Sequence, residues 1–111
     1  MDRTADYVAL VKQVIAEIME EMPPDAEVKS EFLFDEQRKH YEIMQIGWLY
    51  ERRVHGTITH CDVIDGKVWV QHDGTDFGVA DWLAAHGVPK TDIVLGFRAP
   101  DVRQYSGFAT A

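Results

Sequence analysis

The chain has 111 residues, of which 46% are hydrophobic and 27% charged, a balance that predicts a single folded domain over residues 1–111. Its 19 acidic residues outnumber the 11 lysines and arginines, and the net charge of −8 disfavours direct binding to nucleic acid but suits a basic protein partner. The single cysteine, Cys61, excludes an intramolecular disulfide and a thiolate metal cluster within one chain.

The first predicted element is an amphipathic helix from Thr4 to Met22. Its apolar residues recur at three- and four-residue steps, which places them on one buried stripe. They are Tyr7, Val8, Val11, Val14, Ile15, Ile18, Met19 and Met22. We expect Thr4 to cap this helix. Pro23-Pro24 should end it, because proline lacks the amide donor.

Neither an export signal nor a membrane segment is visible in the sequence. The stretch MDRTADYVALVKQ has no continuous apolar core followed by a cleavage site. No other stretch approaches the ~20 apolar residues that span a bilayer. We therefore expect a cytoplasmic protein without a membrane partner.

Strand-like runs occupy the middle of the chain and are joined by short polar connections, which predicts an antiparallel meander of about four strands. These runs are Glu27 to Phe34, His40 to Glu51, Val54 to Ile64 and Lys67 to Asp73. Asp65-Gly66 readily supplies the two positive-φ positions of a tight hairpin turn. Arg52-Arg53 is placed near the preceding turn.

The last third of the chain predicts a short helix and one more strand. Gly74-Thr75-Asp76 offers turn and capping chemistry before a helix that Gly87 should end. The run from Asp92 to Phe97 predicts a C-terminal strand, followed by a short helical turn in the tail. The fold class is therefore α+β: an N-terminal helix, a meander, a short helix and a further strand.

The predicted hairpin gathers polar side chains on one face of the sheet. A two-residue turn at 65–66 places His60 opposite Gln71 and diagonal to Asp73, with Asp62 on the same face. An imidazole and two carboxylates could hold a divalent metal or orient a general base. The same pattern also describes ordinary structural or solvent-facing pairs. His72 should face away from His60, opposite Thr59.

Other catalytic signatures are missing from the sequence. Ser30 and Ser106 lie outside any G-x-S-x-G context, Cys61 lies in mid-strand, and no phosphate-binding glycine loop occurs. The histidines do not form a zinc motif, and His86 is expected at the C-terminal end of the short helix. We expect a protein that is not an enzyme and that holds neither a cofactor nor a metal.

Both faces of the predicted sheet carry apolar side chains, which indicates assembly. Two helices can cover one face, and an exposed patch with Trp and Tyr would be large for a monomer. We expect a homo-oligomer, a dimer or tetramer, unless C-terminal residues fold back over the patch. The candidate interface consists of Trp48, Tyr50, Arg52 and Arg53.

Longer segments of the chain resemble the XisI family, named for a controlling factor in the excision of the fdxN element of cyanobacteria. They are HYEIMQIGWLYERRVHG, HCDVIDGKVWVQHDGTDFGVADWLAAHGVP and KTDIVLGFRAPDVRQYSGFA. Together they run from His40 to Ala109, and the N-terminal helix is compatible. Asp76 stands where the family pattern leads us to expect glutamate, which keeps a carboxylate at the helix start.

The resemblance implies an accessory role in programmed DNA rearrangement, beside a nuclease-like companion called XisH. It implies no catalytic residue. We therefore expect a non-enzymatic controlling factor that acts through protein contacts with a XisH-like partner. The alternatives are a small metal- or ligand-binding domain or enzyme that uses His60, Asp62 and Asp73, and a regulator that binds DNA directly.

Overall fold

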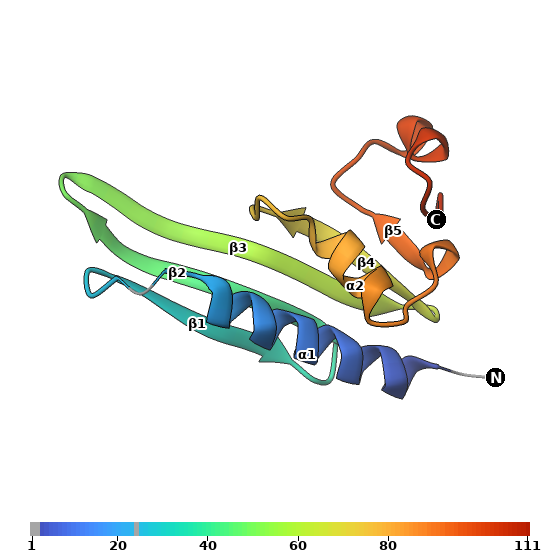
Figure 1. Ribbon diagram of the computed structural model, residues 1–111, viewed down its shortest axis with the longest axis horizontal. Helices are drawn as coiled ribbons and strands as arrows, with labels where there is room; N and C mark the ends of the chain where they lie inside the picture. Colours follow the sequence, from blue (N-terminus) through green and yellow to red (C-terminus); the bar gives the residue numbers. More distant parts are fainter. Residues whose placement is uncertain (1–2, 24) are drawn as a thin grey trace.

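The computed structural model describes residues 3–23 and 25–111 and has the predicted α+β fold. Five strands form one sheet in the order β1-β2-β3-β4-β5, with α1 before the sheet and α2 between β4 and β5 (Figure 1). The elements are α1 Thr4–Glu21, β1 Val28–Asp35, β2 His40–Leu49, β3 Arg52–Ile64, β4 Lys67–Asp73, α2 Val79–Ala85 and β5 Ile93–Leu95, with 3₁₀ helices η1 Lys90–Asp92 and η2 Pro100–Tyr105. In the described part of the chain, neither α1 nor α2 has the length and apolarity that a membrane crossing requires.

Helix α1 begins and ends within a residue of its predicted bounds. Arg3 occupies the N-cap position and Thr4 is the first helical residue, so the prediction that Thr4 caps the helix is wrong. At the other end Met22 is extended, with φ −74° and ψ 133°. That conformation is the one that proline imposes on the residue before it, here through Pro23. Pro24 lies outside the described residues.

The first four strands are antiparallel, as predicted, and the turns after β2 and β3 are two residues long. Asp65 and Gly66 have φ values of 49° and 75°, which confirms the predicted turn between β3 and β4. The turn between β2 and β3 lies at Tyr50, with φ 56°, and the following glutamate. The predicted strand ends on either side of this turn are therefore wrong by two residues: Arg52 and Arg53 begin β3.

Strand β5 joins the sheet differently from the others. It pairs with β4 in the parallel direction, with Val68 opposite Ile93 and Val70 opposite Leu95. A parallel neighbour cannot be reached by a hairpin, and α2 supplies the necessary crossover. Gly87, with φ 105°, ends α2 as predicted and turns the chain towards this strand.

The core lies between the sheet and the two α-helices, which cover the same face (Figure 1). The buried stripe of α1 is the predicted one, and it packs against alternate residues of the strands. The fully buried members with the largest volumes are Tyr7, Tyr41, Ile15, Ile18, Ile43, Leu83 and Ile93. Cys61 is 1% exposed in this core, and burial raises the pKa of its thiol, so its role is packing.

A polar bridge joins the exposed edges of α1 and α2. The Trp82 indole nitrogen donates to Glu17 Oε1 at 3.0 Å, and His86 Nε2 lies 2.9 Å from Glu17 Oε2. His86 Nδ1 lies 2.9 Å from the Trp82 carbonyl oxygen. Both imidazole nitrogens thus face acceptors, which suits the protonated ring at the end of a helix.

This bridge should make the stability of the fold depend on pH. The Trp82 carbonyl and the Glu17 carboxylate raise the pKa of His86 above its ordinary value of 6.5, so this contribution is complete below 6.5 and is lost as pH rises through the raised value. Desolvation opposes the shift of Glu17, but hydrogen bonds from Trp82 and His86 lower its pKa overall. The Glu17 contribution is therefore complete above its ordinary 4.5 and is lost as pH falls through the lowered value.

We expect the bridge to be strongest between pH 4.5 and 6.5. Glu17→Gln should lower the denaturant midpoint within this window. Its deficit relative to the natural protein should be smaller at about pH 8.5, because the contribution of His86 is lost as pH rises through its raised pKa. Glu20→Gln, an exposed change on the same helix, is the matched control and should show no such trend. An equal deficit at both pH values would contradict the bridge.

The opposite face of the sheet is covered only in part. The chain after β5 folds back so that the Arg103 guanidinium lies 5.1 Å from the centre of the Trp69 ring, and Arg103 Nε donates to the carbonyls of Leu95 and Arg98. The C-terminal tail therefore covers part of this face, as the sequence analysis allowed.

Strand β1 lies at the edge of the sheet with exposed Phe32 and Leu33. The expected homo-oligomer stays a prediction.

Candidate functional site

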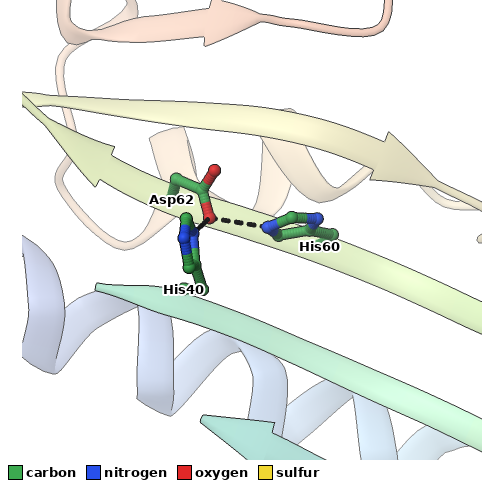
Figure 2. Close-up of side chains that lie close together, drawn as sticks. All are labelled: His40, His60 and Asp62. Carbon is green, nitrogen blue, oxygen red and sulfur yellow. Dashed lines mark hydrogen bonds and ion pairs between the residues drawn. The ribbon is translucent and has the colours of Figure 1, made fainter. Parts of the chain in front are cut away.

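A carboxylate with a histidine on each side lies on the sheet face that points away from α1 (Figure 2). Asp62 in β3 alternates with the core residues Cys61 and Val63, yet it is only 4% exposed. Its Oδ1 atom lies 2.6 Å from His40 Nδ1 and 2.6 Å from His60 Nε2. The two imidazole rings stand nearly edge to face, with centroids 5.7 Å apart.

A β-bulge between β2 and β3 brings His40 to this position. Met44 pairs with Thr57 and Ile43 pairs with Thr59, so Ile58 has no residue opposite it. The extra residue shifts the register by one and places His40 opposite Asp62. Without the bulge, His40 would lie opposite the core residue that precedes Asp62. His40 is the member of the cluster that the sequence analysis missed.

A second bulge, between β3 and β4, changes the predicted register at His60. Cys61 pairs with Val70 as the hairpin turn requires, but His60 pairs with His72, and Gln71 is left without a residue opposite it. The predicted pairing of His60 with Gln71 is therefore wrong. Gln71 still reaches the cluster, because its Nε2 donates to Asp62 Oδ2 at 3.1 Å.

Asp73 does not join the cluster, contrary to the prediction. It lies opposite Thr59, the position predicted for His72. Its Oδ1 accepts hydrogen bonds from the backbone amide and the hydroxyl of Thr75, and its Oδ2 accepts from the amide of Val79 at 2.9 Å. Val79 is the first residue of α2, so Asp73 satisfies an amide at the helix start.

Further polar groups surround the cluster. Glu42 Oε1 lies 3.8 Å from His60 Nδ1, on the side of the ring away from Asp62. The Thr57 hydroxyl donates to the same Glu42 oxygen at 2.8 Å. Both Asp62 oxygens and both His60 nitrogens therefore have polar neighbours. The arrangement can relay or hold a proton between His40 and His60, or present two imidazoles and a carboxylate to a cation.

The candidate interface residues gather at the tip of the β2–β3 hairpin. Trp48 and Tyr50 are 51% and 98% exposed, and the Arg53 guanidinium lies 5.4 Å from the centre of the Trp48 ring. Arg52 is exposed opposite Leu49, at the end of the same ladder. A pocket here is lined by Asp25, Glu27, Trp48, Leu49 and Tyr50. We call Trp48, Tyr50, Arg52 and Arg53 the hairpin-tip surface.

Comparisons with known proteins agree on one family. The family model described as XisI protein matches residues 1–110. A XisI-like protein from Anabaena variabilis ATCC 29413 has a crystal structure that matches with a TM-score of 0.91 and 36% identity, covering 97% of this chain and 99% of that one. The crystal structure of the fdxN element excision controlling factor XisI from the same organism matches with a TM-score of 0.82 and 30% identity, covering 99% and 100%. No curated protein matches the chain.

Proposed function

The chain belongs to the XisI family, and on that premise we propose that it controls the excision of a DNA element without being an enzyme itself, by binding a XisH-like nuclease. The observation that carries the proposal is the similarity to a fdxN element excision controlling factor over 99% of this chain and all of the other. The match therefore extends over the whole fold and is not limited to one part of it.

Action through a protein partner is supported by the surface of the chain. Its net charge of −8 attracts a basic protein and repels the phosphate backbone of DNA. The hairpin-tip surface adds exposed aromatic and arginine side chains, the residue types that contribute most to binding at protein interfaces. Asp25 and Glu27 beside it give the tip an acidic rim.

A non-enzymatic role is supported by the way the nucleophilic and acidic candidates are used. Cys61 is buried in the core with a raised pKa, which disfavours the reactive thiolate. Asp73 is engaged at the start of α2. Cys61 and Asp73, a candidate nucleophile and a candidate catalytic acid, therefore both have structural roles.

The function can be tested by excision in the organism that carries the gene. We expect deletion of the gene to change the fraction of excised element, measured by amplification across the new junction, and the natural gene to restore it. The double variant Trp48→Ala/Tyr50→Ala should fail to restore excision, because it removes the aromatic part of the hairpin-tip surface. Tyr105→Ala, an 81% exposed tyrosine in η2, should restore it. Excision that does not change when the gene is deleted would contradict the proposal.

A further inference from the structure

We propose that His40, His60 and Asp62 form a binding site for a divalent transition metal ion of the zinc class, with a fourth position for an exchangeable ligand. Each residue offers one ligand atom, and these atoms all lie within 4.8 Å of one another. Two imidazole nitrogens and a carboxylate oxygen are a frequent ligand set for such ions, and three protein ligands leave a tetrahedral site open.

The ligand atoms need only a small movement to accept the ion. Zinc lies about 2.0–2.2 Å from nitrogen and oxygen ligands, so atoms at two corners of its tetrahedron are about 3.4 Å apart. The two nitrogens are now 2.6 Å from Asp62 Oδ1, at hydrogen-bond distance. The side chains of His40 and His60 are 41% and 26% exposed, so their rings have room to open this gap, while Asp62 is held in the sheet.

Protons must rearrange when the ion binds. A nitrogen that donates to Asp62 Oδ1 has no lone pair for a metal. On binding, His40 must present the lone pair of Nδ1 and His60 that of Nε2, and each neutral ring then carries its proton on the other nitrogen. The ion takes the place of the hydrogen bonds to Oδ1 and neutralises the buried carboxylate.

Two groups around the cluster lie where a metal site usually has outer partners. A histidine that binds a metal usually donates its second N–H to a carboxylate, and a ligating carboxylate is usually hydrogen-bonded through its other oxygen. Glu42 Oε1 lies 3.8 Å from His60 Nδ1, the nitrogen that would then carry the proton. Gln71 donates to Asp62 Oδ2 at 3.1 Å, which leaves Oδ1 for the ion.

Two β-bulges determine which side chains meet at this site. One bulge places His40 opposite Asp62, and the other leaves Gln71 free to reach the same carboxylate. Bulges recur beside functional sites, because they turn a side chain that the regular ladder would direct elsewhere. The nitrogen-rich ligand set favours zinc over magnesium, which prefers six oxygen ligands.

The test is a calorimetric titration of the purified full chain with ZnCl₂. We expect one equivalent to bind to the natural protein and MgCl₂ not to compete. His40→Ala and His60→Ala should each weaken binding by more than about 100-fold, and Glu42→Gln by about 10–100-fold, as for an outer partner. His55→Ala is the matched control, an exposed histidine of β3, and should bind as the natural protein does. Absence of zinc binding by the natural protein, or binding by His40→Ala and His60→Ala as tight as that of the natural protein, would overturn the proposal.

Two further variants separate a loss of zinc binding from a loss of folding and from a loss of the proposed excision function. His40→Gln keeps an amide that can donate to Asp62 but removes the imidazole, and we expect it to fold with the natural circular dichroism spectrum and to lose zinc binding. The double variant Trp48→Ala/Tyr50→Ala should bind zinc unchanged. If His40→Gln retains full zinc affinity, the cluster is not the site, whatever the outcome of the excision test.

Discussion

Gly47→Ala should destabilise the protein by about 3 kcal/mol, the upper end of the usual range for overpacking. A methyl group at this position would lie 2.1 Å from the backbone oxygen of Glu27 and 2.7 Å from the Cα atom of Val28. These are backbone atoms of the chain that enters β1, so no side chain can rotate to relieve the clash. The start of β1 has to move away from β2, which also strains the hydrogen bond from the Trp48 amide to the Glu27 oxygen.

The sheet offers a matched control for this substitution. Gly56 in β3 lies opposite Gln45, and a Cβ atom there would meet nothing within 4 Å. Gly56→Ala should therefore change the free energy of unfolding by no more than about 0.5 kcal/mol, or stabilise the fold slightly by restricting the unfolded chain. Urea unfolding of the variants beside the natural protein measures both effects. Equal effects of the two substitutions would show that the close approach at Gly47 costs nothing.

The sequence predicts those parts of the fold that local rules determine. The stripe from Tyr7 to Ile18 has helical spacing and is buried in α1 as expected. Asp65-Gly66 forms the tight turn, and Gly87 ends α2, since each occupies a positive-φ position that few residues adopt readily. The resemblance to the family rests on the segments from His40 to Ala109, which include both of these turn positions.

The candidate site could not be predicted with the same success, because it depends on two bulges. Alternation along a strand assigns faces only while the ladder is regular, and one extra residue reverses the assignment beyond it. Ile58 causes such a shift in β3, and neither its type nor its neighbours distinguish it in the sequence. His40 was therefore missed, while His60 and Asp62, which share one strand, were correctly placed together.

The second bulge also explains why Asp73 does not join the cluster, because the shifted register places it opposite Thr59. A carboxylate near the end of a strand can point into a polar face or back to the next helix, and sequence spacing permits both. The amide groups at Thr75 and Val79 decide the matter, because an amide at a helix start needs an acceptor. The Asp73 carboxylate therefore accepts hydrogen bonds from backbone amides and does not lie on the polar face.

The largest functional effect is expected from the hairpin-tip surface. Trp48 lies near the end of β2 and Tyr50 lies in the turn that follows, and both side chains are exposed. Exposed tryptophan and tyrosine side chains contribute most when a partner buries them. Trp48→Ala/Tyr50→Ala should therefore weaken binding to a XisH-like nuclease by at least about 30-fold, which corresponds to one strong interface residue. The core is unaffected by these changes, because neither side chain belongs to it.

The measurement that tests the account most directly is the affinity of the purified chain for a XisH-like nuclease, the partner that we propose, at low and at high salt. We predict a complex at low salt that weakens as salt screens the acidic surface, that the Trp48→Ala/Tyr50→Ala variant loses, and that Tyr105→Ala retains. The absence of a complex at low salt would contradict control of excision through this partner.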